Sequence, residues 1–120
     1  MENRFEDLKV WQLAHQYVLD VYAIIKKMPS DEKYGLIDQL RRSSSSIPTN
    51  IVEGNERKTT KEFIQFLYTS KGSLSESKYQ LILACDLGYI SKEDCTKLSN
   101  QGSEIGKMIN GLIKYLRSRI

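Results

Sequence analysis

The stretch 39–54 holds the side chains of this sequence that come closest to a reaction site. It reads Gln-Leu-Arg-Arg-Ser-Ser-Ser-Ser-Ile-Pro-Thr-Asn-Ile-Val-Glu-Gly. A serine nucleophile needs a base to activate it, and the single histidine, His15, lies in a different part of the chain. Glu53 has no obvious second carboxylate with which to share acid–base work. We therefore interpret the stretch as structural and predict that the protein is not an enzyme.

The cysteines and glycines also lack the spacing of a metal or cofactor site. Cys85 and Cys95 lie ten positions apart without a CxxC pattern. We expect reduced, structural thiols, with a disulfide between them as the alternative. Neither cysteine has a histidine or second cysteine at ligand spacing, and no glycine-rich loop follows a strand. The sequence predicts no metal and no cofactor.

Basic side chains are the groups best suited to bind a partner. The net charge of +3 permits an anionic partner without requiring one. Phosphate contacts dominate non-specific affinity for nucleic acid, so cations gathered on one surface are the relevant feature. The candidate contacts are Arg41, Arg42, Arg57, Lys58, Lys61, Lys71 and Lys78, and more positive charge follows at Lys107, Lys114, Arg117 and Arg119. The alternative is a set of solvated helix faces with acidic partners one turn away.

Apolar periodicity indicates the elements that must position these side chains. The first predicted helix covers about residues 7–28 and has two apolar stripes, Trp11-Ala14-Val18-Val21-Ile25-Met28 and Val10-Leu13-Tyr17-Ile24. So wide an apolar arc predicts two packing neighbours, the second of which could belong to another chain. The next helix covers about residues 33–56. Its apolar phase continues across Pro48, which favours one helix kinked at residues 44–48.

Capping signals divide the second half of the chain into two further helices. Thr59 or Thr60 caps a helix that ends at Leu87-Gly88, and Thr59 with Glu62 fits a capping box. Ser91 caps a last helix, which is weakest in helix formers over residues 99–106. Helices joined by short loops predict an all-α, antiparallel up-down four-helix bundle, kinked near Pro48, as a single domain over residues 1–120.

The distribution of apolar and charged residues along the chain also predicts where in the cell the protein is located. No apolar run approaches the roughly 20 residues that cross a bilayer, so we expect no membrane segment. Residues 1–5 lead directly into charged positions, so we expect no signal peptide and a cytoplasmic protein.

The order of motifs resembles a known family. Tyr34-Gly35-Leu36 and Gln39-Leu40-Arg41-Arg42 precede Ser46-Ile47-Pro48-Thr49-Asn50-Ile51-Val52-Glu53-Gly54, and Leu87-Gly88-Tyr89-Ile90 comes later. The string Ser-Ile-Pro-x-Asn-Ile-x-Glu-Gly is the specific part. Over nearly its whole length the chain resembles the bacterial four helix bundle proteins, also called 23S ribosomal RNA intervening-sequence proteins. One departure is that Ser75 and Ser77 flank Glu76, where apolar or small residues are more usual.

The resemblance implies an assembly more clearly than a reaction. Members of the family are small bundles that form homopentameric rings, and many of their genes lie inside insertions in the large ribosomal RNA gene. A similar bundle, the accessory variability determinant of diversity-generating retroelements, is a basic pentamer that binds nucleic acid and a reverse transcriptase. Candidates for a structural motif or a subunit interface are Trp11, Ser46, Pro48, Asn50, Glu53 and Gly54. Arg42 and Glu53 could pair between subunits.

Two hypotheses follow for function. The first is a non-enzymatic homopentamer that binds RNA or another nucleic acid through basic side chains. The second is a protein–protein scaffold whose ring presents a platform to an enzyme such as a reverse transcriptase.

Overall fold

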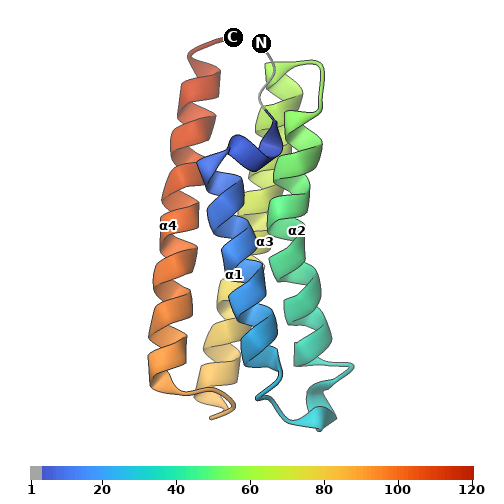
Figure 1. The fold of residues 1–120 in the computed structure, drawn as a ribbon, viewed down its shortest axis with the longest axis vertical. Coiled ribbons are helices and arrows are strands. Elements are labelled where there is room, and N and C mark those ends of the chain that lie inside the picture. Colours follow the sequence, from blue (N-terminus) through green and yellow to red (C-terminus); the bar gives the residue numbers. More distant parts are fainter. Residues whose placement is uncertain (1–3) are drawn as a thin grey trace.

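Four long helices make up almost all of this protein. The structure, a computed structural model, describes residues 4–120, and within that part of the chain no strand is present. The helices are α1 Lys9–Ile25, α2 Leu36–Asn55, α3 Thr60–Asp86 and α4 Lys92–Arg117, with short 3₁₀ turns η1 at Phe5–Asp7 and η2 at Ser30–Glu32 (Figure 1). The predicted all-α fold class is confirmed.

Successive helices run antiparallel and pack side by side. α1 packs on α2 and α4, and α3 packs on the same two helices. The bundle measures 46 × 24 × 20 Å. The C-terminus and the α2–α3 turn lie at one end, and the α1–α2 and α3–α4 turns lie at the other (Figure 1). The apolar arc of α1 therefore finds both of its neighbours within the same chain.

The core follows the predicted periodicity and also contains hydrogen-bonded polar side chains. Among the fully buried side chains are Tyr17, Leu40, Ile51, Leu67 and Ile105, contributed by all four helices. The Tyr17 hydroxyl lies 2.9 Å from the Ser77 hydroxyl of α3, so the buried phenol has a partner. Ser77, the departure noted in the sequence, therefore completes a buried hydrogen bond.

The ends of the helices match the capping signals closely. The backbone N–H of Glu62 donates to the Thr59 hydroxyl at 3.1 Å, and that hydroxyl bonds to the Glu62 carboxylate at 2.8 Å. Thr59 is therefore the predicted N-cap, and the Glu62 carboxylate accepts from the Thr59 hydroxyl in place of the backbone N–H that a capping box would use. Gly88 has a φ of 77°, and the backbone N–H of Tyr89 donates to the carbonyl of Ala84. α3 thus ends in a Schellman motif, which requires a left-handed residue at Gly88.

The first two helices are shorter than predicted at their ends. α1 begins at Lys9, because Leu8 adopts an extended conformation after the η1 turn. It ends at Ile25, three residues before Met28, and Pro29 then starts the separate η2 turn. α2 begins at Leu36, because the backbone of Gly35 is not helical.

α2 continues unbroken through Pro48, as the apolar phase predicted. Three hydroxyls bond to carbonyls four residues earlier: Ser44 to Leu40 at 2.6 Å, Ser45 to Arg41 at 2.7 Å and Thr49 to Ser45 at 2.8 Å. Hydroxyl bonds of this kind compete with the backbone hydrogen bonds of the helix, next to the position where proline cannot donate. The proposed kink itself stays a prediction.

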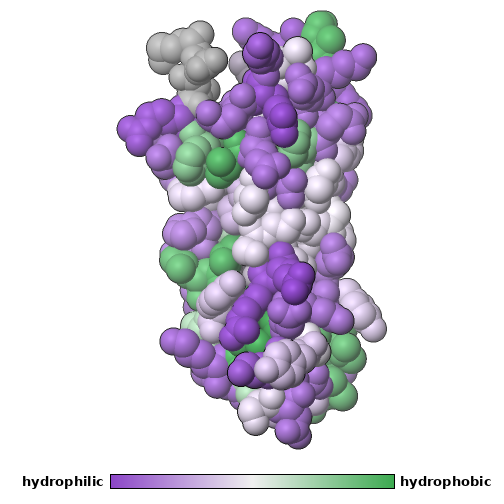
Figure 2. Space-filling view, turned by 90° about the vertical axis from the view of Figure 1, so that its right-hand side faces the viewer, coloured by the Kyte–Doolittle hydropathy of each residue, from purple (hydrophilic) through white to green (hydrophobic). Residues whose placement is uncertain are grey.

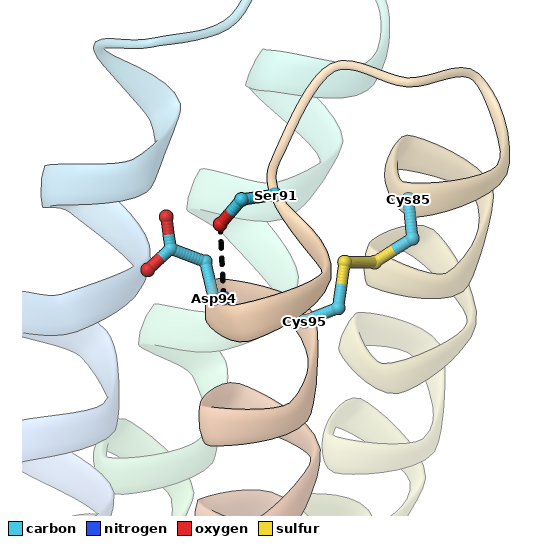
Figure 3. The surroundings of a disulfide bond; sticks show 4 residues. All are labelled: Cys85, Ser91, Asp94 and Cys95. Atoms are coloured by element: carbon cyan, nitrogen blue, oxygen red, sulfur yellow. Dashed lines mark hydrogen bonds between the residues drawn. A yellow bond between two sulfur atoms is a disulfide. The ribbon is translucent and has the colours of Figure 1, made fainter.

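The expectation that the two cysteines are reduced is wrong. Cys85 and Cys95 form a disulfide between the last turn of α3 and the first turn of α4 (Figure 3). Their Cα atoms lie 6.3 Å apart, within the usual range for a disulfide. Sequence spacing alone could not show this, because the antiparallel return of α4 brings the two residues together.

Candidate nucleic-acid interface

The predicted basic residues between positions 41 and 61 do not form one cluster. Arg42 and Arg57 are 15 positions apart, which corresponds to roughly 22 Å at a rise of 1.5 Å per residue. Arg41 and Arg42 therefore lie in the half of α2 near its start, whereas Arg57, Lys58 and Lys61 surround the α2–α3 turn. On the α2 side of the molecule, hydrophilic surface toward the two ends is separated by a paler zone (Figure 2).

Two of these arginines already have partners. The Arg42 guanidinium donates to the Asp38 carboxylate at 2.9 Å, one turn earlier on α2. An ion pair between Arg42 and Glu53 of another subunit, as hypothesised, would therefore have to compete with the Arg42–Asp38 contact. Arg57 lies over the ring of Phe66, 4.6 Å from its centroid. Arg42 and Arg57 thus fit the alternative, solvated surfaces with local partners, better than they fit a common phosphate-binding site.

A different basic surface lies across α3 and α4. Lys78 packs its aliphatic stem against Gly102 of α4, with the nearest stem carbon 3.4 Å from where a Cβ would stand. Lys71 lies two turns earlier, on the same side of α3, and both lysines are half-buried. Arg117 of α4 donates to the Tyr68 hydroxyl of α3, and its guanidinium lies 5.5 Å from the Tyr68 ring centroid. These contacts join the surfaces of α3 and α4 toward both ends of the pair.

Two further lysines share the Arg117 side of α4. Lys107, Lys114 and Arg117 recur at spacings of seven and three, so they follow one stripe along α4, of which Arg117 reaches α3. All three are exposed. We call the combined surface the α3–α4 basic face, and it consists of Lys71, Lys78, Lys107, Lys114 and Arg117.

This face is distinguished by the acidic residues that are missing from it. The segments 63–75 of α3 and 105–119 of α4 lie opposite each other, and neither contains an aspartate or glutamate. Of the ion pairs in the described part of the chain, none involves a member of the face. Lys71, Lys107, Lys114 and Arg117 lie within these acid-free segments, and Tyr68 adds an aromatic ring beside them. Lys78 lies outside them and shares a groove with Asp86. An exposed cationic strip of this kind can bind phosphates.

The serines and asparagine of the motif join α2 to α3 within one subunit. Ser43 donates to the Gln80 side chain at 2.6 Å. Ser73 donates to the Ser46 hydroxyl at 2.9 Å, and the Asn50 amide donates to the same oxygen at 2.9 Å. These small side chains let the two helices approach closely while their polar groups remain paired. The structure thus gives Ser46 and Asn50 a role inside the subunit, and their predicted role at a subunit interface is untested.

Gly54 serves the same helix pair by leaving space. A Cβ at this position would stand 2.7 Å from the Cβ of Phe66 and 2.8 Å from Cδ1 of Phe63. Pro48 is buried beside the core residue Ile47, whereas Glu53 is exposed. The motif therefore encodes the contact between α2 and α3 and contains no assembled set of catalytic groups.

The remaining candidates for chemistry also have structural partners. Trp11 is half-buried and stacks on His15 with ring centroids 5.0 Å apart, while Phe5 meets it edge-on. Within residues 4–120, His, Cys, Asp and Glu side chains do not gather in groups able to hold a metal ion. None of the helices in that part of the chain is both long enough and apolar enough to span a bilayer.

Sequence reasoning missed the contribution of α4 to the basic surface. Lys107, Lys114 and Arg117 were noted as charge but not included among the candidate contacts. A usable signal was present, because an acid-free run in one helix faces an acid-free run in its antiparallel neighbour. The sequence placed more weight on five cations that are close to one another in the chain: Arg41, Arg42, Arg57, Lys58 and Lys61. Along an extended helix, however, residues that are close in sequence can lie far apart in space.

The fold and this surface define a four-helix bundle protein with a basic face across α3 and α4. The chain belongs to the 23S rRNA-intervening sequence protein family, whose family model matches residues 6–111. It is similar in structure to a protein of unknown function from the S23 ribosomal protein family of Bacteroides thetaiotaomicron. That likeness has a TM-score of 0.81 at 25% sequence identity and covers 88% of this chain and 98% of the other. No curated protein matches the chain.

Proposed function

We propose that the protein is a non-enzymatic RNA-binding bundle that uses the α3–α4 basic face. The observation that carries this proposal is the acid-free pairing of α3 and α4. It holds four cations, Lys71, Lys107, Lys114 and Arg117, that form no ion pair within the described part of the chain. The family description, which refers to an intervening sequence of 23S rRNA, makes RNA the natural nucleic acid to test. Because the contacts are with phosphates, binding should depend strongly on salt and weakly on base sequence.

The test compares two double variants of equal charge. Lys107→Gln with Lys114→Gln removes exposed charge from the face, and Lys33→Gln with Lys92→Gln removes it from the opposite end of the bundle. Fluorescence anisotropy with labelled single-stranded and duplex RNA is measured over a series of salt concentrations. We expect the first variant to bind less tightly, with a salt slope reduced by about 1.4–1.8 if each lysine contacts one phosphate. The matched control should keep the slope of the original chain.

Two results would contradict the proposal. One is the absence of binding by the unaltered chain even at low salt. The other is an equal loss of affinity in both double variants, which would mean that only overall charge matters. Parallel variants at Arg41 and Arg57 test the surface that the sequence alone favoured.

We also propose that the chain acts as a homo-oligomer, and the family resemblance makes a pentamer the specific expectation. In a ring the basic face would be repeated once per subunit, so a net charge of +3 per chain would be multiplied. Light scattering should then give about five times the chain mass of 13.9 kDa. A monomeric mass would refute the oligomer and leave RNA binding to be judged by its own assay.

One observation favours the scaffold alternative. Tyr79 and Ile82, three residues apart on α3, expose 62% and 56% of their surface. Exposed apolar groups of this size can contact a protein partner. Recovery of one specific protein from nuclease-treated host extract, lost on Tyr79→Ser with Ile82→Ser, would support a scaffold role. If only RNA-dependent partners are recovered, the scaffold hypothesis fails.

A further inference from the structure

The disulfide lies at the surface of the bundle, where small molecules can reach it. Cys85 is in the last turn of α3 and Cys95 is in the first turn of α4, and both are half-buried. Figure 3 shows the sulfur atoms bridging the two helices, while the Asp94 carboxylate points to the other side of α4, toward α1. Asp94 accepts from Lys27, two residues after the end of α1, at 3.2 Å. The side of the disulfide away from α1 is therefore free of that ion pair.

An open groove of about 350 Å³ runs beside the two sulfur-bearing residues. Both cysteines line it, together with Lys78, Ile82, Asp86 and Asn100. The lining combines a cation, an anion, amide and hydroxyl groups and an aliphatic side chain. Its size falls at the lower end of the range for small-molecule sites, roughly 300–1,000 Å³. The groove therefore brings a reactive sulfur pair and groups that can bind a small polar ligand to the same place.

We propose that this groove receives an anionic low-molecular-weight thiol, which exchanges with the Cys85–Cys95 disulfide. The ligand thiolate attacks one Sγ, a mixed disulfide forms, and the other cysteine leaves as a thiolate that takes up a proton. A second thiol then attacks the mixed disulfide and releases the ligand as its own disulfide. Two electrons pass to the protein, and two ligand thiols are oxidised. Lys78 supplies the cation that would bind a ligand carboxylate.

The surrounding turn can hold its shape while the disulfide is open. Gly88 carries the left-handed conformation that ends α3, and the Ser91 hydroxyl accepts from the backbone N–H of Asp94 at 3.1 Å. The Tyr89 hydroxyl donates to the Glu32 carboxylate at 2.9 Å, and Ile90 is buried. Exchange therefore takes place on the folded protein. This inference does not depend on RNA binding.

The test compares two reducing thiols of different charge. Glutathione serves as the anionic thiol and 2-mercaptoethanol as the neutral one, and the rate of disulfide opening is followed by alkylation and mass spectrometry. We expect Lys78→Gln to slow the reaction with glutathione about 1.5- to 5-fold, the range that 0.2–1 kcal/mol of exposed charge pairing gives. Asp86→Asn should accelerate it to a similar degree. Both changes should alter the rate with 2-mercaptoethanol less, because its thiolate carries no carboxylate that Lys78 could bind.

Lys71→Gln is the matched control, because Lys71 shares the α3–α4 basic face but does not line the groove. It should leave both rates unchanged. Equal effects of Lys78→Gln on both thiols, or equal effects of Lys71→Gln and Lys78→Gln on glutathione, would overturn the proposal.

A second measurement covers the case in which Lys78→Gln disturbs the packing on Gly102. The Cys95→Ser chain is mixed with oxidised glutathione, so that the Cys85 thiolate attacks it, forms a mixed disulfide and releases one glutathione thiolate. We expect one glutathione per chain, formed faster than the equivalent adduct with the neutral disulfide of 2-mercaptoethanol. A rate that does not favour the anionic disulfide would contradict the proposed groove specificity.

Discussion

Replacing Gly54 with alanine should destabilise the bundle, although alanine is the better helix former. The new Cβ would lie 2.7 Å from the Cβ of Phe66, which is fixed to the α3 backbone. Relieving the overlap requires α2 and α3 to separate locally, and overpacking of this kind costs about 1–3 kcal/mol. The gain in helix propensity returns about 1 kcal/mol. The net loss should be up to about 2 kcal/mol, or up to about 8 °C in Tm at an unfolding entropy typical of 120 residues.

Gly72→Ala provides the matched control. Gly72 lies in the middle of α3, is exposed, and has no atom within 4 Å of the position where its Cβ would stand. There the same substitution gains helix propensity without overlap, so Tm should rise by about 2–4 °C. Thermal and urea unfolding followed by circular dichroism measure both variants. A Gly54→Ala protein as stable as Gly72→Ala would show that close packing of α2 and α3 does not explain the glycine that ends the motif.

Three further perturbations test other parts of the structure. Gly88→Ala places a side chain at a φ of 77° and should lower the free energy of unfolding by about 1 kcal/mol in urea titrations, whereas unchanged stability would refute a required left-handed residue. Reducing the disulfide releases a cross-link with a sequence separation of ten. The chain-entropy relation predicts a loss of about 2–3 kcal/mol, seen as a lower urea midpoint with reductant than without it. Burial raises the pKa of Tyr17 above its ordinary value of 10.0, so the unfolded chain ionises first and stability should fall as the pH rises above 10. Tyr17→Phe should flatten that fall, and an equally steep decline in both proteins would contradict the assignment.

The helices and their ends could be predicted because the information is local. The threonine cap at Thr59, the serine cap at Ser91 and the left-handed Gly88 each depend on residues within one turn. The 3.6-residue periodicity likewise identified the buried face of each helix. The predicted helix bounds were wrong where a short turn replaces the end of a helix. At the start of α1, for example, the extended residue Leu8 separates α1 from the η1 turn.

The motif in α2 shows which features could not be predicted from neighbouring residues alone. Its serines, Asn50 and Gly54 were predicted to be structural, and the structure agrees. Their partners Gln80, Ser73 and Phe66 were not predictable. All three lie in the next helix, 12 to 37 residues away in the sequence, on a face that the packing selects. A pattern of small residues indicates close approach without showing which helix approaches.

The sequence by itself determined that this chain forms four amphipathic helices with defined ends, and its motif identified the family. It did so because helical periodicity and caps depend on neighbouring residues. Only the tertiary structure decided that Cys85 meets Cys95 and that Arg117 meets Tyr68. It also moved the best candidate for an RNA-binding surface from the arginines of α2 to the facing sides of α3 and α4. The physical reason is that the register of two antiparallel helices decides which distant side chains share a surface, and that register is set by core packing.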